Sequence, residues 1–203
     1  MVERATTRPA SLPLGPTEGK GVGWNGLAAL IATEAALFFY LLFSYFYLGA
    51  SAPSGWLMEP HPKLALALPN TIILLLSSVA MWWGERGVKR DKRGAALAGT
   101  GLALILGTAF AVVQTWEWKA KTYGLGTSSY ASLYFVTTGF HMAHVLVGLA
   151  VLAFLFLWIA RGYFSPVRRI AVTNGTYYWH FVDVVWLFVF ATYYLSPYLG
   201  FAR

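Results

Sequence analysis

The stretch GTYYWHFVDVVWLFVFATYYL, residues 175–195, decides how the rest of the chain is interpreted. It is apolar and aromatic over about 20 residues, the length that an α-helix needs to cross the hydrocarbon core of a bilayer. Within it, His180 and Asp183 stand three residues apart. Residues at this spacing share one face of a helix, so the stretch predicts a membrane span with a polar face.

The composition of the whole chain supports a membrane protein. Of its 203 residues, 58% are apolar, 17% are aromatic and only 11% are charged, whereas soluble domains carry about 25% charged residues. The net charge of +7 does not indicate nucleic-acid binding, because the basic residues lie between apolar runs, as charges that flank membrane spans do. The absence of cysteine excludes disulfides, thiolate metal sites and a cysteine nucleophile.

Further segments of the chain, besides residues 175–195, are long and apolar enough to cross a bilayer. The five predicted spans are residues 24–48, 64–84, 94–116, 130–159 and 173–198. They predict an all-α integral membrane protein, a five-transmembrane-helix bundle that forms a single domain over residues 22–203. Residues 1–21 contain no apolar core and are expected to form a cytoplasmic tail. Gly99, Gly101 and Gly107 predict that the third span packs closely against a neighbour.

The distribution of basic residues predicts the orientation of these spans. Eleven of the 15 lysines and arginines lie in the N-terminal tail and in the loops GERGVKRDKRG and RGYFSPVRR, which fall on one side of a five-span protein. The other side has four. Because loops rich in lysine and arginine stay in the cytoplasm, we expect the N-terminus to be cytoplasmic and the C-terminus to lie outside.

Ionisable side chains inside the predicted spans are the candidate site. Such groups are costly at membrane depth and usually face the interior of a bundle, where they meet a partner. The candidates are Glu34, Glu117, His141, His144, His180 and Asp183. Counting about 1.5 Å per residue, we expect Glu34, His144 and Asp183 to lie at similar depth.

Residue types and spacing leave four interpretations open. The histidines with Asp183 or Glu117 supply the nitrogen and oxygen ligands of a metal site. Histidines that face one another on two helices can ligate a haem, and Glu34 can belong to a proton route. In the fourth interpretation these groups hydrogen-bond to one another and fix helix packing, and the spacing favours this one because no ligand motif is repeated.

Several of these segments resemble subunit III of the haem–copper oxidases, the cytochrome c oxidase group. YYWHFVDVVWLFVF and TGFHMAHVLVG are similar to the C-terminal part of that family, TEAALFFYLLFSYFY to its first shared helix with a buried glutamate, and LPNTIILLLSS to the next helix. VQTWEW is similar to the family's Gln-x-x-Glu-aromatic helix end. The resemblance covers about residues 24–195, in the same order.

The resemblance implies an accessory subunit with no redox centre of its own. It would pack against subunit I, which holds the haems and the copper, and would also accompany subunit II. It would support proton uptake, protect subunit I during turnover and hold structural phospholipids. Glu34 matches the family's carbodiimide-reactive glutamate, whereas His141, His144, His180, Asp183 and Glu117 are expected to be structural. No residue of this chain is expected to be catalytic or to bind metal.

The resemblance also bears on subtype, membrane and lipid. The long form of the family has seven helices with a lipid-filled cleft, and five spans resemble the five-helix bacterial form, which resides in the plasma membrane. YYWHFVD favours a cytochrome c oxidase, with a quinol oxidase or a protein associated with nitric oxide reductase as the alternative. Candidates from other classes are a haem-binding electron carrier and a small transporter. Arg86, Arg90 and Arg93 are candidates to bind lipid headgroups.

Overall fold

The computed structural model describes residues 22–52, 55–57 and 64–200, and these residues are helical apart from short connections. The long helices are α1 (Val22–Ser51), α2 (Leu64–Lys89), α3 (Arg93–Lys119), α4 (Ser129–Ala160) and α5 (Ile170–Phe190). A π-helical turn, η1 (Ala191–Leu195), and a 3₁₀ turn, η2 (Ser196–Leu199), follow α5. All five regions are long and apolar enough to cross a membrane, which confirms the predicted fold class.

The helix bounds differ from the predicted spans mainly at two places. Helix α2 continues five residues beyond the predicted end at residue 84, and the predicted fifth span closes in the η1 and η2 turns rather than in regular α-helix. The predicted cytoplasmic tail, residues 1–21, lies outside the described residues.

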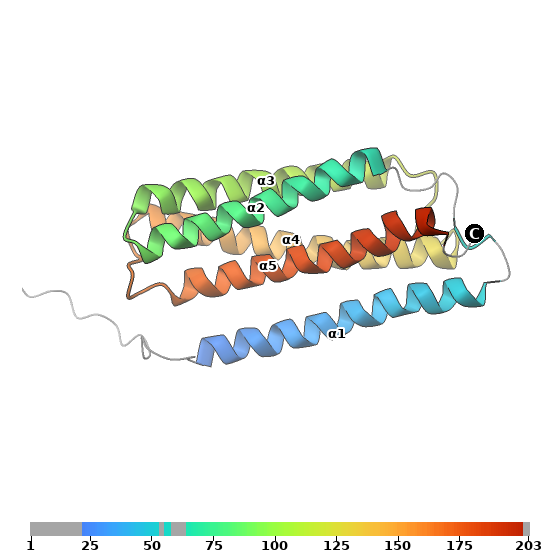
Figure 1. Ribbon diagram of the computed structural model, residues 1–203, viewed down its shortest axis with the longest axis horizontal. Coiled ribbons are helices and arrows are strands. Elements are labelled where there is room, and N and C mark those ends of the chain that lie inside the picture. The colour runs from blue at the N-terminus through green and yellow to red at the C-terminus, as the bar shows by residue number, and fades with distance from the viewer. Residues whose placement is uncertain (1–21, 53–54, 58–63, 201–203) are drawn as a thin grey trace, which may run out of the picture.

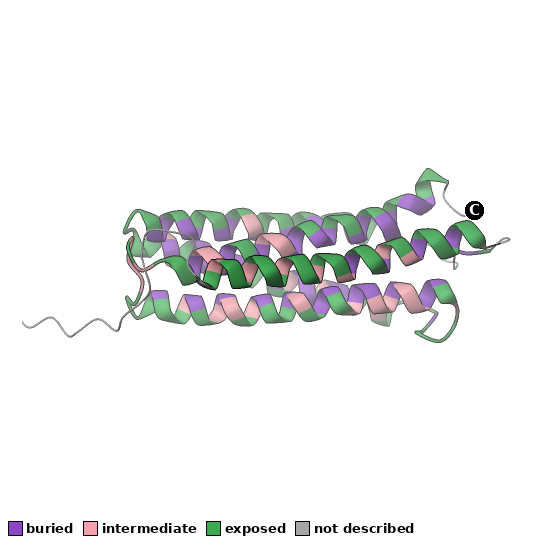
Figure 2. Cartoon of the chain, turned by 90° about the horizontal axis from the view of Figure 1, so that it is seen from below, coloured by how far each residue is buried: buried purple, intermediate pink, exposed green. Residues whose placement is uncertain are grey.

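The helices run side by side and alternate in direction (Figure 1). Helices α2 and α3 form a tight hairpin, and both α4 and α5 pack against it, whereas α1 lies along the edge and makes its main contacts with α4 and α5. Much of the surface of α1 is exposed, as Figure 2 shows. The start of α1 and the α2–α3 and α4–α5 connections lie at one end, which we call the basic end.

Small residues bring α2 and α3 together until their backbones touch. A Cβ atom on Gly99 would lie 2.4 Å from the Gly84 nitrogen, and one on Gly87 would lie 2.5 Å from the Ala96 nitrogen. Without a hydrophobic driving force between helices in lipid, such close packing is a main source of association. The close contact predicted for the third span is therefore present.

Trp179 fills the centre of the bundle. Its side chain is fully buried, and its ring lies so close to Gly107 of α3 and Gly148 of α4 that a Cβ on either glycine would be 2.7–2.9 Å from ring atoms. The indole N–H donates a hydrogen bond to Ser77 Oγ of α2 at 3.0 Å. One aromatic residue of α5 thus contacts all three other helices of the main bundle.

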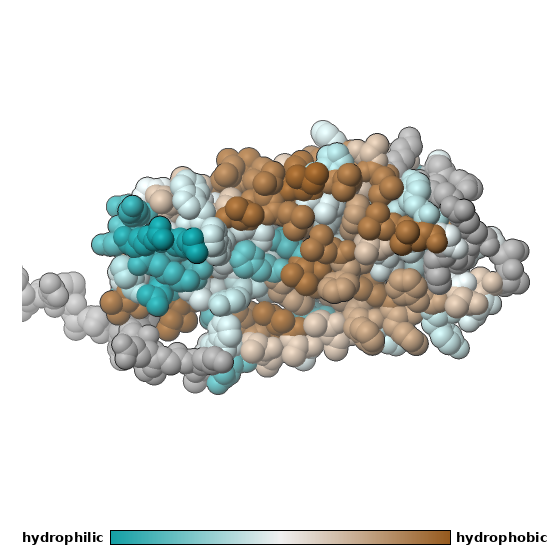
Figure 3. Space-filling model, in the orientation of Figure 1, coloured by the Kyte–Doolittle hydropathy of each residue, from teal (hydrophilic) through white to brown (hydrophobic). Residues whose placement is uncertain are grey.

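The exterior is that of a protein surrounded by lipid or by other membrane helices. Large apolar side chains point outward along every helix, among them Phe39 at 72% and Ile105 at 68% exposure. Figure 3 shows hydrophobic residues over most of one face and hydrophilic residues gathered at the basic end.

Candidate functional site

Glu34 of α1 and His144 of α4, for which only a similar depth was expected, are in direct contact. His144 Nε2 lies 3.1 Å from Glu34 Oε2, and the side chains are 15% and 27% exposed, respectively. Nδ1 of the same imidazole lies 2.7 Å from the Phe140 carbonyl oxygen. A carbonyl only accepts, so Nδ1 carries a proton.

That arrangement leaves one proton to be shared by the pair. Either His144 Nε2–H donates to the Glu34 carboxylate, or a protonated Glu34 donates to Nε2. Both forms have no net charge, and the proton moves between them along one hydrogen bond. The pair can therefore hold a proton at membrane depth without leaving a lone charge in lipid.

His141 lies three residues before His144 on the same side of α4 and is buried more deeply in the bundle. It is fully buried, its Nε2–H donates to the Val182 carbonyl of α5 at 3.2 Å, and its ring packs on Trp186 with centroids 4.8 Å apart. Trp186 in turn donates its indole N–H to Thr71 Oγ1 of α2 at 3.0 Å. His141 thus joins α4 to α5.

His180 and Asp183 are neighbours on α5, but they are not hydrogen-bonded to each other in the described residues. His180 Nδ1 is instead hydrogen-bonded to the Ser78 hydroxyl of α2. Asp183 is 3% exposed, and neither of its carboxyl oxygens has a hydrogen bond of normal geometry to a described group. Of these two side chains, His180 is therefore the one that joins α5 to α2 by a hydrogen bond in the described residues.

Glu117 lies apart from the other candidates, at the end of the bundle opposite the basic end. Its carboxylate accepts hydrogen bonds from Tyr194 O–H at 2.9 Å and Tyr134 O–H at 3.3 Å, and it pairs with Lys121 at 3.0 Å. Lys121 and Glu117 side chains are 9% and 7% exposed, respectively. Tyr194 belongs to the π turn η1, so Glu117 ties the end of α5 to α3 and α4.

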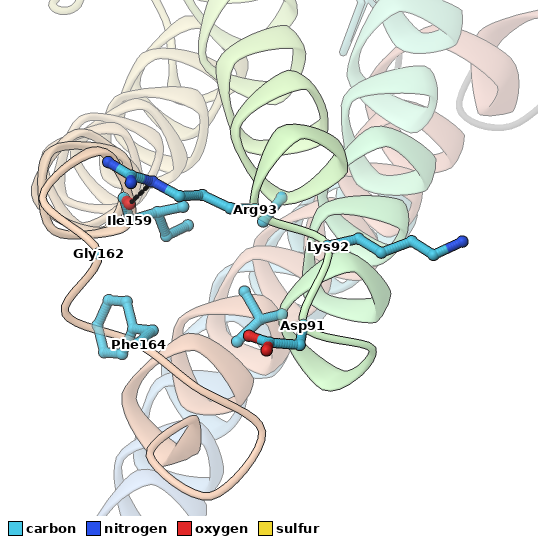
Figure 4. Close-up of a pocket in the computed structure, with 8 residues that line it drawn as sticks. Asp91, Lys92, Arg93, Ile159, Gly162 and Phe164 are labelled. Carbon is cyan, nitrogen blue, oxygen red and sulfur yellow. Dashed lines mark hydrogen bonds between the residues drawn. The ribbon is translucent and has the colours of Figure 1, made fainter.

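The three arginines proposed for lipid headgroups have different surroundings. Arg93 closes the end of α4: its Nε–H donates to the Ile159 carbonyl at 3.1 Å, and an Nη2–H donates to the Ala160 carbonyl (Figure 4). Carbonyls in the last turn of a helix need such partners. Arg86 lies 3.6 Å above the Trp82 ring, and Arg90 is exposed.

A hollow of about 150 Å³ lies between the α2–α3 turn and the end of α4, and Figure 4 shows residues that line it. Lys92 points away from Arg93. Within the described residues, no group of three or more His, Asp and Glu side chains is placed to hold a metal ion.

Sequence reasoning missed three groups that matter to these contacts. Glu85 lies in a stretch that reads as a basic loop, yet it is 6% exposed inside the extended α2 and accepts from Thr173 O–H of α5 at 2.8 Å. Ser77 accepts a hydrogen bond from Trp179 of α5, and Ser78 is hydrogen-bonded to His180 of α5. Two adjacent serines inside a predicted membrane span were the available signal.

The fold and these contacts define a multi-pass helical membrane protein in which polar side chains join the helices. The family model for cytochrome c oxidase subunit III matches residues 17–198. This match covers most of the chain, including all the candidate residues. The chain belongs to the cytochrome c oxidase subunit III family.

Curated relatives agree with the family model. Cytochrome c oxidase subunit 3 of Pisaster ochraceus is 35% identical over 173 residues, which cover 81% of this chain and 66% of that protein. The Gallus gallus protein of the same name is 31% identical over 188 residues, covering 88% and 71%. The Drosophila melanogaster protein is 31% identical over 182 residues, covering 86% and 69%. The chain thus spans about two thirds of the length of these relatives.

Proposed function

We propose that this chain is the accessory, non-redox subunit III of a respiratory terminal oxidase. The complex reduces oxygen and couples that reaction to proton translocation, while haem and copper reside in the partner subunits. The chain's own task is to stabilise subunit I and to support proton uptake. The observation that carries the proposal is the family match over residues 17–198, in which Glu34 stands at membrane depth beside His144.

Glu34 is our candidate for the residue that supports proton uptake. A carboxylate exposed to lipid would be costly, and the hydrogen bond of Glu34 to His144 lowers that cost in both proton positions. Because α1 packs only along one edge of the bundle, the pair lies near the surface, where a partner helix or a lipid can reach it. A proton held there is available to a neighbouring subunit.

We propose subunit I as the main partner, with subunit II and phospholipids as further contacts. The apolar exterior of every helix suits partner helices and acyl chains alike. At the basic end, Arg86 and Arg90 are the better candidates for anionic headgroups, because Arg93 is already bound to the end of α4. Arg86, above Trp82, has the position of an interfacial residue.

We propose that the basic end faces the cytoplasm and that the C-terminus lies outside. The two loops that hold eight of the lysines and arginines meet at this end of the bundle, together with the start of α1 (Figure 1). The bacterial plasma membrane is the location that the five-helix resemblance implies.

Gentle purification of the tagged chain tests the proposal. We expect a haem–copper subunit I to co-purify, with the absorption bands of its haems and with copper. Purification of the chain in high yield with a haem but no second polypeptide would favour an electron carrier instead. Purification alone and without haem, from cells that respire through this oxidase, would contradict the proposal.

A further inference from the structure

The buried carboxyl group of Asp183 is an unusual polar group in the bundle. It lies inside the fifth helix with 3% exposure, and neither oxygen has a hydrogen bond of normal geometry in the described part of the chain. Ser78 of α2 lies beside it, but the Ser78 hydroxyl is hydrogen-bonded to His180 Nδ1. A buried polar group without such a bond is rare in native proteins and requires an explanation.

The groups around Asp183 do not neutralise a negative charge. On α4, His141 donates its Nε2–H to the Val182 carbonyl, and His144 is paired with Glu34 of α1. Helix α3 contains no Asp, Glu, Lys, Arg or His between Arg93 and Glu117. On α2, Glu85 is ionisable but acidic, and its partner Lys89 lies at the helix end.

Burial of an isolated carboxylate costs far more than burial of the neutral acid, so such a group takes up a proton. The surroundings of Asp183 therefore favour the protonated carboxyl. A group of this kind at membrane depth acts as a proton store only if a proton can reach it.

Two polar contacts between α2 and α5, one nearer the basic end and one beside Asp183, mark the route that we consider. Along α5, Thr173 and His180 are seven residues apart, and along α2, Glu85 and Ser78 are also seven apart. Seven residues make about two helical turns, so each pair lies on one face. Thr173 O–H donates to Glu85 at 2.8 Å, His180 is bonded to Ser78, and Glu85 is close enough to influence His180 electrostatically.

We propose that Asp183 is a proton-binding site that fills and empties through Ser78 and His180 from the basic end of the bundle. In the filling step, protonated His180 gives the proton on Nδ1 to the Ser78 oxygen, and Ser78 gives its own hydroxyl proton to the Asp183 carboxylate. His180 loses one proton and one positive charge, Asp183 gains one proton and loses its negative charge, and Ser78 is unchanged. The inference does not depend on which oxidase the chain serves.

The composition of the chain makes this site unusually accessible to spectroscopy. It contains two aspartates, Asp91 and Asp183, so aspartate labelled with ¹³C at its carboxyl group gives two infrared signals in the full chain reconstituted in lipid. Asp91 is exposed in the α2–α3 turn with φ 55°, a conformation that asparagine tolerates well. Asp91→Asn is therefore the matched control for Asp183→Asn.

At neutral pH we expect one labelled band of a protonated acid, lost in Asp183→Asn and retained in Asp91→Asn. In heavy water this band should shift as its proton exchanges. In Ser78→Ala and in His180→Gln the shift should be at least about tenfold slower, since each 1.36 kcal/mol added to a barrier slows a step tenfold. A labelled Asp183 that absorbs as an ionised carboxylate would overturn the proposal, and so would a shift equally fast in all variants.

Discussion

Gly84 of α2 and Gly99 of α3 meet backbone to backbone, so that a Cβ on Gly99 would lie 2.5 Å from the Gly84 Cα and 2.7 Å from the Ala80 carbonyl oxygen. No side chain fits between them without moving a helix. This contact sets the separation of the α2–α3 hairpin on which α4 and α5 pack.

Gly99→Ala should therefore destabilise the bundle by about 1–3 kcal/mol, the usual cost of overpacking. Thermal denaturation of the purified protein in detergent measures the effect. Gly139→Ala in α4 is the matched control, because a Cβ there meets nothing within 4 Å. The control should be neutral or slightly stabilising, since alanine favours helix over glycine. Equal stability of the two variants would show that α2 and α3 are not in contact here.

Ser77→Ala should leave the indole N–H of Trp179 without its acceptor in the centre of the bundle. Hydrogen bonds between membrane helices average about 0.6 kcal/mol, with a maximum near 1.7, so we expect a loss within that range. Thr33→Ala is the control, because the Thr33 hydroxyl is exposed and donates to the Leu30 carbonyl of its own helix. A Ser77→Ala protein as stable as the Thr33→Ala protein would argue against this hydrogen bond.

The orientation can be tested with single cysteines, because the chain contains none of its own. Val167 in the α4–α5 connection and Leu125 in the α3–α4 connection are 66% and 58% exposed, and neither is charged. We expect a membrane-impermeant thiol reagent added to whole cells to label Leu125→Cys but not Val167→Cys. The reverse pattern would place the basic end outside, and permeabilised cells confirm that both cysteines can react.

Because of Tyr123, in the α3–α4 connection, we expect the folded protein to lose stability at alkaline pH. Burial, with a smaller contribution from the nearby Glu117 charge, raises the pKa of Tyr123 from 10.0 to about 12. Between these values the folded protein keeps a proton that the unfolded chain has lost, so stability falls as the pH rises. Tyr123→Phe should make this fall less steep, whereas Tyr163→Phe, at an exposed position, should not. Identical slopes in all three proteins would contradict the burial of Tyr123.

Hydropathy predicts the five helices well because a helix in lipid must satisfy its own backbone and present apolar side chains over its length. The count along the spans gave Glu34, His144 and Asp183 a similar depth, but it did not predict that Glu34 and His144 are in contact. It could not find the end of α2, because Glu85 resembles a loop residue until its hydrogen bond to Thr173 and its ion pair with Lys89 are known.

The sequence could not predict which side chains on neighbouring helices are the hydrogen-bond partners of the candidate residues. His180 and Asp183 share a face, and their proximity suggested a bond, but a serine of α2 is the partner of His180. The π turn at Ala191–Leu195 has no sequence signature, although it brings Tyr194 to Glu117. The His180 and Tyr194 contacts depend on how α5 packs against the other helices, and the spacing of residues within α5 does not specify that packing.

The number of turnovers that the oxidase completes before it loses activity tests the central claim most directly. We expect Glu34→Ala to assemble and to start at a rate close to that of the unchanged enzyme, but to inactivate after several-fold fewer turnovers, because the shared proton of the Glu34–His144 pair is gone. Glu34→Asp should restore part of the lifetime, and Thr33→Ala should leave it unchanged. A Glu34→Ala oxidase that lasts as long as the unchanged enzyme would contradict the account.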